Sequence, residues 1–243
     1  MAPGRLYGVG VGPGDPELMT LKAARILREA PVLAFFRKKG RPGNGRTIVE
    51  GYLHAAVIEE ALTYPLTIEV PAEDPVYQSA LTAFYDASAE RLAAHLDAGR
   101  DVAAISEGDP FFYGSFMPIF HRLSPRYPCE VVPGVTGMSG CWTRAGTPIT
   151  YGDDVLTVVP GTLDRPALTE RLRRTDAAVI MKLGRNLPKV RAVLEELGLI
   201  GRAVYVERGT MRDEKVTPLD TRDPGAEAPY FSMIVVPGRG RLL

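Results

Sequence analysis

The sequence predicts an α/β fold made of two α/β domains. Short apolar runs, typical of buried strands, are followed by glycine-rich loops and then by helical segments with one apolar face. This strand–loop–helix order repeats along the chain, which is typical of a parallel sheet covered by helices. Pro133 and Gly134 interrupt the pattern near the middle of the 243 residues. We therefore expect one domain over residues 1–133 and a second over residues 134–243.

The first domain is expected to begin with a strand and a helix. Residues 6–11 form a short apolar run that predicts a buried strand. Asp15 and Pro16 predict the start of a helix, because Asp accepts hydrogen bonds at an N-cap and Pro lacks an N–H that the first turn leaves unused. The expected apolar face of this helix contains Leu18, Leu21, Ile26 and Leu27.

Three more strands and a second helix complete the expected first domain. The strands are predicted over residues 32–36, 102–105 and 130–132, and a basic loop over residues 37–46. Asp74 and Pro75 predict the start of the second helix, and Gly99 its end. Its expected apolar stripe contains Leu81, Phe84, Tyr85, Leu92 and Leu96. Because ligands of parallel sheets bind at the carboxyl ends of the strands, the glycine loops that follow the first and third strands are candidate ligand loops.

The second domain shows the same alternation. Strands are predicted over residues 155–159, 178–183, 203–207 and 231–236. A helix is predicted over residues 186–197, where Gly198 would end it.

Composition excludes several classes of protein. The formal net charge is zero, with 45% hydrophobic and 24% charged residues, so we expect no nucleic-acid partner and no anionic membrane surface as partner. No apolar run is long enough for a membrane span or a signal peptide. Cys129 and Cys141 form no disulfide framework and are expected to be reduced thiols in the cytoplasm. The three histidines have no metal-ligand spacing, so we expect no metal site.

The most informative stretch is the first glycine loop. Glycines alternate from Gly8 to Gly14, and such residues let backbone approach a ligand closely. The spacing matches neither the G-x-G-x-x-G of dinucleotide sites nor the Gly-Lys-Ser/Thr of a P-loop. The loop therefore favours a cofactor that is neither a dinucleotide nor a triphosphate.

Four glycine-containing segments, taken together, identify a family. They are residues 7–16, 106–115, 131–140 and 206–210. In this order and spacing they resemble the tetrapyrrole methyltransferases of cobalamin and sirohaem synthesis, and the likeness spans nearly the whole chain. The resemblance implies the tetrapyrrole methylase fold, with S-adenosylmethionine in a cleft between the two α/β domains, S-adenosylhomocysteine as product, and a homodimer.

The resemblance also implies the residues that contact S-adenosylmethionine. They are Pro13, Glu107, Gly108, Asp109, Phe112, Thr136, Gly137, Lys182 and Gly209. Two of them depart from the uroporphyrinogen members of the family, which have glycine in place of Glu107 and methionine in place of Lys182. From the residues alone, Glu107 and Asp109 could hold ribose hydroxyls or an ammonium group, or Asp109 and Pro110 could simply cap the following helix.

The second expected strand bears on the choice of substrate. Uroporphyrinogen methyltransferases have an acidic residue, thought to act as a base, where this chain has Phe36. Residues 35–40 instead resemble the family members that methylate carbon 20 of precorrin-2. The alternatives are the same reaction on a cobalt-bearing substrate, methylation of uroporphyrinogen III, and, in a different class, a non-catalytic nucleotide-binding protein. An NAD-dependent reductase is disfavoured by the missing dinucleotide motif.

Two basic clusters are candidate binding sites for a tetrapyrrole, which has many carboxylates. Arg37, Lys38 and Lys39 begin a run of ten residues that contains no acid, and its alternative interpretation is a solvated loop. Arg208 and Arg212, with Lys215, form the second cluster. Arginine suits carboxylates because its planar fork makes two parallel hydrogen bonds.

Methyl transfer to carbon needs alignment more than covalent help, and the carbon must then lose a proton. Tyr113, close to Asp109 in sequence, is the candidate catalytic residue, which would assist this step or orient the macrocycle. The alternative is a packed aromatic side chain whose hydroxyl makes a structural hydrogen bond.

Overall fold

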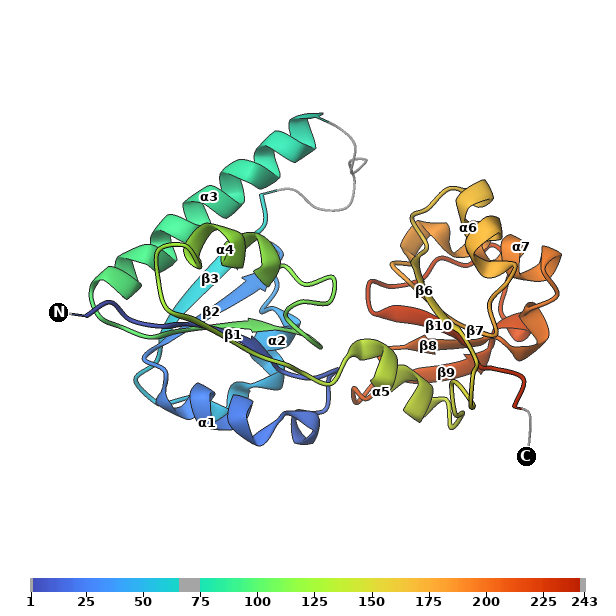
Figure 1. The fold of residues 1–243 in the computed structure, drawn as a ribbon, viewed down its shortest axis with the longest axis horizontal. Helices are drawn as coiled ribbons and strands as arrows, with labels where there is room; N and C mark the ends of the chain where they lie inside the picture. The colour runs from blue at the N-terminus through green and yellow to red at the C-terminus, as the bar shows by residue number, and fades with distance from the viewer. Residues whose placement is uncertain (1, 66–74, 241–243) are drawn as a thin grey trace. The chain divides into compact units, whose positions relative to one another are not determined.

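The computed structural model describes residues 2–65 and 75–240. The chain divides into two compact units, Met1–Thr136 and Gly137–Leu243, and each unit contains one sheet (Figure 1). The domain boundary between residues 133 and 134 stays a prediction, because compact units need not coincide with domains that fold alone.

The sheet of unit 1 is entirely parallel, as predicted. Its strand order is β3-β2-β4-β1-β5. The strands are β1 (Leu6–Gly10), β2 (Val32–Arg37), β3 (Ile58–Thr63), β4 (Val102–Ser106) and β5 (Cys129–Val132). In the register of the sheet, Val9 lies beside Ile105 on one side and Val132 on the other. The loops after β1, β4 and β5 therefore leave neighbouring strands at one edge of the sheet.

Helices cover both faces of this sheet. They are α1 (Leu21–Glu29), α2 (Asn44–Ile48), α3 (Pro75–Asp97) and α4 (Phe116–Leu123), with short 3-10 turns at Pro16–Leu18 and Glu50–Tyr52. α3 and α4 pack on one face (Figure 1). There, Leu96 and Ile119 share a core with Ala104. α1 and α2 pack on the other, where Leu27 and Ile48 share a core with Ile105. Burial of these side chains is the main stabilising contribution.

The first helix differs from its prediction. Asp15 caps the 3-10 turn, accepting a 2.9 Å hydrogen bond from Glu17 N–H. α1 then starts afresh with Thr20 as its N-cap, whose Oγ1 accepts a 3.1 Å hydrogen bond from Ala23 N–H. Leu21, the first residue of α1, is 92% exposed, and Leu18, in the 3-10 turn before it, is 37% exposed. The predicted apolar face was wrong for these two leucines and is confirmed for Ile26 and Leu27.

Three other elements test the prediction for unit 1. α2 begins inside the segment that was predicted to be loop, and β3 was not predicted. α3 ends at Asp97, and Gly99 follows it with a φ of 75°, as expected for a glycine that ends a helix. Asp74, the predicted cap of α3, lies outside the described residues.

The sheet of unit 2 is mixed, with both parallel and antiparallel pairs of strands. Its order is β6-β7-β10-β8-β9. The strands are β6 (Leu156–Pro160), β7 (Ala177–Met181), β8 (Val204–Glu207), β9 (Lys215–Pro218) and β10 (Ser232–Val236). Only β6 and β7 pair in parallel among the described strands of this sheet, because β8 turns back into the unpredicted β9 and β10 then runs antiparallel to both β7 and β8.

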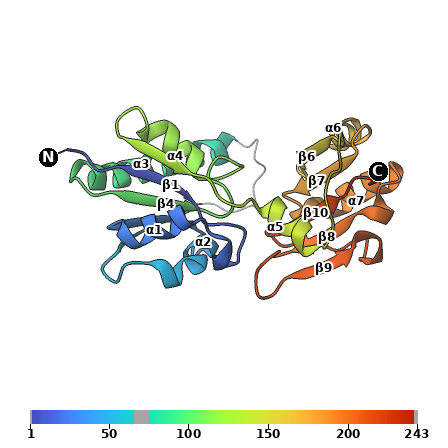
Figure 2. The same cartoon turned by 60° about the horizontal axis from the view of Figure 1, so that its bottom comes forward.

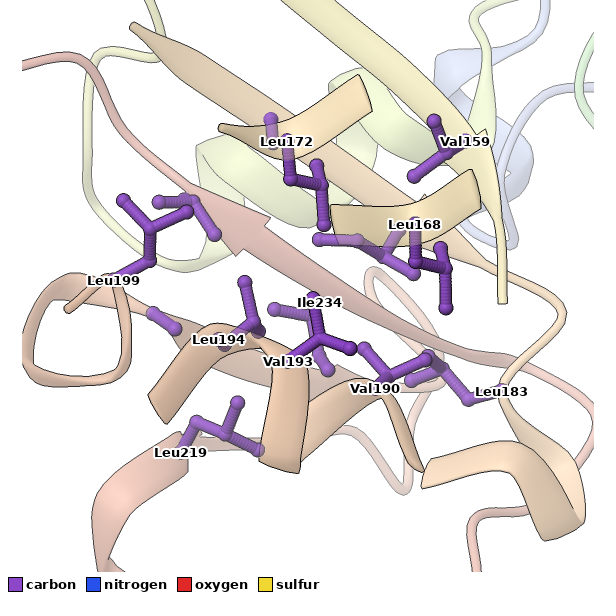
Figure 3. Packing of buried hydrophobic residues seen from close by; sticks show 14 of the residues in the cluster. Val159, Leu168, Leu172, Leu183, Val190, Val193, Leu194, Leu199, Leu219 and Ile234 are labelled. Carbon is purple, nitrogen blue, oxygen red and sulfur yellow. The ribbon is translucent and has the colours of Figure 1, made fainter. Parts of the chain in front are cut away.

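Helices flank this second sheet as well. They are α5 (Gly137–Arg144), α6 (Arg165–Leu172) and α7 (Leu187–Glu196), with 3-10 turns at Gly184–Asn186, Ile200–Arg202 and Leu219–Thr221. α6 and α7 share a core with β10, in which Leu168, Val190 and Ile234 are fully buried (Figure 3). α5 packs on the opposite face, beside β10 (Figure 2). There, Cys141 belongs to the same buried cluster as Met233. The predicted helix over residues 186–197 is confirmed as α7. Among the described helices, none is long and apolar enough to cross a bilayer.

Candidate functional site

Three glycine loops meet at the carboxyl edge of the unit 1 sheet. The N–H of Gly108, after β4, donates a 2.8 Å hydrogen bond to the carbonyl of Gly12, after β1. A Cβ on Gly10 would lie 2.7 Å from the carbonyl oxygen of Gly108, and one on Gly134 would lie 2.9 Å from Cα of Gly10. These distances leave no room for a side chain. The three loops are therefore packed backbone to backbone, and we call this arrangement the glycine cradle (Gly10, Gly12, Gly108, Gly134).

Two glycines of the cradle also need positive φ angles. Gly12 has a φ of 80° and Gly108 a φ of 68°. This left-handed conformation is costly for residues with a Cβ. The cradle thus presents bare backbone at the edge where ligands of parallel sheets bind.

Asp109 uses both carboxylate oxygens within the cradle. Its Oδ1 accepts a 2.9 Å hydrogen bond from Phe111 N–H, and its Oδ2 accepts a 3.1 Å hydrogen bond from Gly134 N–H. The alternative that Asp109 caps the next helix is wrong, because α4 starts later with Ser115 at its N-cap. Asp109 therefore ties the loop after β4 to the loop after β5.

Glu107 connects the loop after β4 to α2. Its Oε1 accepts a 2.8 Å hydrogen bond from the backbone N–H of Gly45, in the first turn of α2. Burial raises the pKa of Glu107, and hydrogen bonds from its own backbone N–H and that of Gly45 oppose this rise. Glu107 therefore joins the cradle to the end of the basic segment (residues 37–46).

The basic segment has partners that its sequence does not reveal. Arg37 Nε donates a 3.0 Å hydrogen bond to Thr63 Oγ1, and Arg46 Nη2 lies 2.8 Å from Glu59 Oε1. Both partners come from β3, the unpredicted strand. Lys38 is half-buried and Lys39 is exposed. The charge of Arg46 is therefore neutralised by Glu59. The two lysines directly follow the end of β2.

Phe36 lies in an aromatic cluster beside this segment. Its ring centroid is 5.8 Å from that of Tyr64, in a stacked arrangement, 6.4 Å from that of Phe84 and 6.3 Å from that of Tyr85. The hydroxyl of Tyr64 forms a short hydrogen bond with that of Ser115. An aromatic cluster therefore lies at the end of β2, with the bonded hydroxyls of Tyr64 and Ser115 as its polar groups.

The other predicted residues of unit 1 lie in the same loops. Pro13 is buried after β1, and Thr136 is half-buried after β5. Tyr113 is 46% exposed, and its ring lies edge-on to that of Phe112, with centroids 5.0 Å apart. The structure thus brings the unit 1 candidates to one edge of the sheet, and their ligand contacts stay predictions.

The candidates of unit 2 also gather at one edge. β7 and β8 both run antiparallel to β10, which lies between them, so their carboxyl ends point the same way. Lys182 follows β7, while Arg208 and Gly209 follow β8. Arg208 N–H donates a 2.7 Å hydrogen bond to Phe231 just before β10. Gly137 begins α5.

The second basic cluster contains acids. Arg208 pairs with Asp213, and Lys215 Nζ lies 3.4 Å from Glu207 Oε1. Arg212 is exposed on the loop between β8 and β9. These acids reduce the positive charge that the sequence pattern led us to expect.

Backbone strain marks the same loops. Within residues 2–65 and 75–240, the non-glycine residues with positive φ are Tyr113, Lys182, Arg208 and Thr210. Tyr113, Lys182 and Arg208 are predicted site residues. Thr210 is not, but it directly follows Gly209, which is one. Such strain costs of the order of 1–3 kcal/mol per residue and tends to be retained where function needs it. Thr210 was missed, because no sequence signal announces a β-branched residue at a φ of 71°.

The thiols and acids form no metal centre in the part of the chain that the structure describes. No group of three or more His, Cys, Asp or Glu side chains there could hold an ion. Cys141 is buried, and desolvation raises its pKa to about 12, although a hydrogen bond from the Gly209 backbone opposes the rise. Burial likewise raises the pKa of the half-buried Cys129.

Comparison with known proteins shows the family of the chain. The family of Tetrapyrrole (Corrin/Porphyrin) Methylases matches residues 5–223. The chain is 56% identical to a precorrin-2 C(20)-methyltransferase from Sinorhizobium sp, over 97% of this chain and 96% of that protein. It is 28% identical to a cobalt-precorrin-2 C(20)-methyltransferase from Salmonella typhimurium, over 96% of each chain.

A solved structure gives the same result for the fold. It is the uroporphyrin-III C-methyl transferase from Thermus thermophilus, complexed with S-adenyl homocysteine. The TM-score is 0.67 at 25% identity, over 96% of this chain and 92% of that one. This protein therefore belongs to the tetrapyrrole methylase family.

Proposed function

We propose that this protein transfers a methyl group from S-adenosylmethionine to carbon 20 of precorrin-2, giving precorrin-3A and S-adenosylhomocysteine in cobalamin biosynthesis. The observation that carries the proposal is the 56% identity to a precorrin-2 C(20)-methyltransferase along 97% of the chain. The glycine cradle supports it, because the cradle offers backbone groups at a ligand-binding edge without the spacing of a phosphate loop.

The residues present fit S-adenosylmethionine. A Cβ at Gly10 or Gly134 would clash with the backbone of the neighbouring loops, so these glycines let the three loops pack together at the edge where ligands of parallel sheets bind. Bound S-adenosylmethionine supplies a methyl group on a sulfonium, and it has no phosphate that would require basic side chains. The proposed contacts are Pro13, Glu107, Gly108, Asp109, Phe112, Thr136, Gly137, Lys182 and Gly209. Because the carboxylates of Glu107 and Asp109 already accept backbone hydrogen bonds, their role is to hold the loops as well as to meet the ligand.

The basic residues are proposed to bind the substrate. Arg37, Lys38, Lys39, Arg208 and Arg212 would contact its carboxylates through charge-assisted hydrogen bonds. The apolar ring of Phe36, stacked on Tyr64, supplies no base at this position. Tyr113, held in a strained conformation with a φ of 54°, is proposed to orient the macrocycle or to assist proton loss from the methylated carbon.

A second substrate is favoured by one comparison. The 28% identity to a cobalt-precorrin-2 C(20)-methyltransferase over nearly the full length supports the same chemistry on a cobalt-bearing ring. We further propose a homodimer in the cytoplasm, which sedimentation and cell fractionation test. The free thiols of Cys129 and Cys141 support a reducing compartment.

Mass spectrometry tests the function. The protein is incubated anaerobically with methyl-labelled S-adenosylmethionine and with precorrin-2, cobalt-precorrin-2 or uroporphyrinogen III in turn. We expect one labelled methyl group on precorrin-2, placed at carbon 20 by NMR. Labelling of cobalt-precorrin-2 alone would replace the first proposal with the second, and labelling of none of the three would overturn both.

A further inference from the structure

The loop after β8 contains two strained residues on either side of a glycine. Arg208 has a φ of 50° and Thr210 a φ of 71°. A positive φ is disfavoured for any residue with a Cβ and most of all for a β-branched one. Without other contacts, Thr210 would relax to a negative φ and move its neighbours. The surrounding structure must therefore hold this loop in place.

Glu214 makes one of the contacts to this loop. Its Oε2 accepts a 2.9 Å hydrogen bond from the backbone N–H of Thr210. Met211 N–H donates a 2.9 Å hydrogen bond to Arg208, and Glu214 N–H donates a 3.2 Å hydrogen bond to Met211. The turn is thus closed from Arg208 to Glu214, with the carboxylate bonded to the strained residue itself.

Arg144 fixes the carboxylate from a separate element. This residue ends α5, and its Nε lies 2.7 Å from Oε1 and 2.8 Å from Oε2 of Glu214, while Nη2 also bonds Oε1. The Glu214 side chain is only 19% exposed. The hydrogen bond from Arg144 lowers the pKa of Glu214 against the opposing effect of burial. The carboxylate is therefore ionised and oriented.

The same helix touches the loop at a second point. A Cβ on Gly209 would lie 3.0 Å from Cys141 Sγ, so the Gly209 backbone rests directly on the thiol of α5. α5 thus contacts the glycine through Cys141 and the strained threonine through the Arg144–Glu214 pair. Both contacts set where the backbone of residues 208–210 lies.

We propose that Glu214, oriented by Arg144, is a positioning residue that holds Thr210 in its left-handed conformation and so places Gly209 and Arg208 for ligand binding. This inference rests on the proposed function, in which Gly209 contacts S-adenosylmethionine and Arg208 the tetrapyrrole. Neither Glu214 nor Arg144 needs to touch a ligand. The alternative is an ordinary ion pair that fastens the β8–β9 hairpin and has no connection with the strain.

A double-mutant experiment separates the two. The variants are Glu214→Ala, Glu214→Gln, Thr210→Gly and the double variant Thr210→Gly/Glu214→Ala. Glu196→Ala is the matched control, because Arg165 and Glu196 form a 2.9 Å pair between two helices of the same unit. S-adenosylhomocysteine binding is measured by calorimetry, kcat and KM with precorrin-2 by absorbance, and folding by circular dichroism.

Glu214→Ala is expected to weaken S-adenosylhomocysteine binding about tenfold, as loss of a hydrogen bond to a charged group would. Glu214→Gln should lose less than about threefold, because its amide oxygen still accepts from Thr210. Glycine adopts positive φ without strain, so in the Thr210→Gly background the Glu214→Ala change should cost less than about twofold. Glu196→Ala should bind as the unmodified protein does.

Two results would overturn the inference. One is an unchanged affinity in Glu214→Ala, and the other is the same tenfold loss in the Thr210→Gly background, which would leave only the hairpin ion pair. If Glu214→Ala fails to fold, Arg144→Met in both backgrounds takes its place with the same expectations. An unmodified protein that neither binds S-adenosylhomocysteine nor methylates precorrin-2 would instead overturn the proposed function, and this inference with it.

Discussion

The backbone N–H of Gly45 donates a 2.8 Å hydrogen bond to Oε1 of Glu107, and this bond joins two segments with different proposed roles. Gly45 lies in the first turn of α2, which follows Arg37, Lys38 and Lys39 in the basic segment, while Glu107 begins the loop after β4. This bond therefore ties the start of α2 to the loop after β4.

Glu107→Gln should change the pH dependence of stability. Burial raises the pKa of Glu107 above its ordinary value of 4.5, so the ionised group is less stable in the folded protein than in the unfolded chain. Its unfavourable contribution is absent below the ordinary pKa and grows as pH rises to the folded pKa. The neutral glutamine avoids this cost. Relative to the unmodified protein, the variant should gain stability as pH rises, measured by urea unfolding across pH.

The control for this prediction is Glu17→Gln, at an exposed position of the same unit. If the stability of Glu107→Gln, relative to that of the unmodified protein, falls as pH rises, the expected sign is contradicted.

Gly134→Ala should disrupt the glycine cradle. The new methyl group would overlap the carbonyl oxygen of Gly108 and lie 2.9 Å from Cα of Gly10. We expect a loss of stability of about 1–3 kcal/mol, as for other overpacked sites, and cofactor binding weakened at least about tenfold. Calorimetry with S-adenosylhomocysteine and urea unfolding measure the two effects. Gly51→Ala, whose Cβ meets nothing within 4 Å, should change neither.

Gly108→Val should abolish cofactor binding in a protein that still folds. Gly108 has a φ of 68°, a conformation that a β-branched side chain strongly resists. The local loop would therefore change its path, whereas the buried strands on either side keep their packing. A native circular dichroism spectrum together with unchanged affinity for S-adenosylhomocysteine would show that the loop is purely structural.

Replacing Arg37, Lys38 and Lys39 together by alanine should weaken tetrapyrrole binding and spare cofactor binding. Each desolvated contact to a carboxylate contributes about 1.5–3 kcal/mol, and each exposed one much less. Lys39 is exposed, so we expect most of the loss from the other two, and a smaller loss at high salt. Anaerobic titration with precorrin-2 measures it. The triple variant of the exposed Arg171, Arg173 and Arg174 removes equal charge from unit 2 and should bind normally.

Cys141 should resist alkylation in the folded protein. With a pKa of about 12, roughly one thiol in ten thousand is ionised at about pH 8. Iodoacetamide followed by peptide mass spectrometry should therefore label Cys141 only after unfolding in urea. The half-buried Cys129 is the internal comparison and should react faster in the folded state. Rapid labelling of Cys141 in the native protein would contradict its burial under Gly209.

The sequence predicted buried strands better than it predicted edges and short helices. β4 was predicted over residues 102–105, and the observed strand is one residue longer, ending at Ser106. The prediction succeeded because an uninterrupted apolar run bounded by polar residues is a strong local signal. β3 was missed because Glu59 and Glu60 break its apolar pattern, yet both are paired, with Arg46 and with Arg91. α2 was missed because Gly43 precedes it with no side-chain cap.

The candidate site was predictable in its loops and not in its supporting contacts. Glycine spacing locates the cradle, since the loops follow neighbouring parallel strands. The contact between Gly45 and Glu107 joins residues 62 positions apart, which no local pattern reports. The positive φ of Thr210 could not be predicted either, because β-branched residues such as threonine strongly disfavour that conformation.

The place of β1 between β4 and β5 has a consequence for folding. Leu6 pairs with Val102 on one side and with Cys129 on the other, whereas β2 and β3 pair with each other. On the ribosome, β1 emerges first and then waits about a hundred residues for its neighbours, which makes its closure a slow, long-range step. Until β5 has been made, one edge of β1 has backbone N–H and C=O groups without a strand partner, which leaves it open to pairing with other chains. The cradle joins segments that end or follow β1, β4 and β5, so it can form only after all three strands have been made.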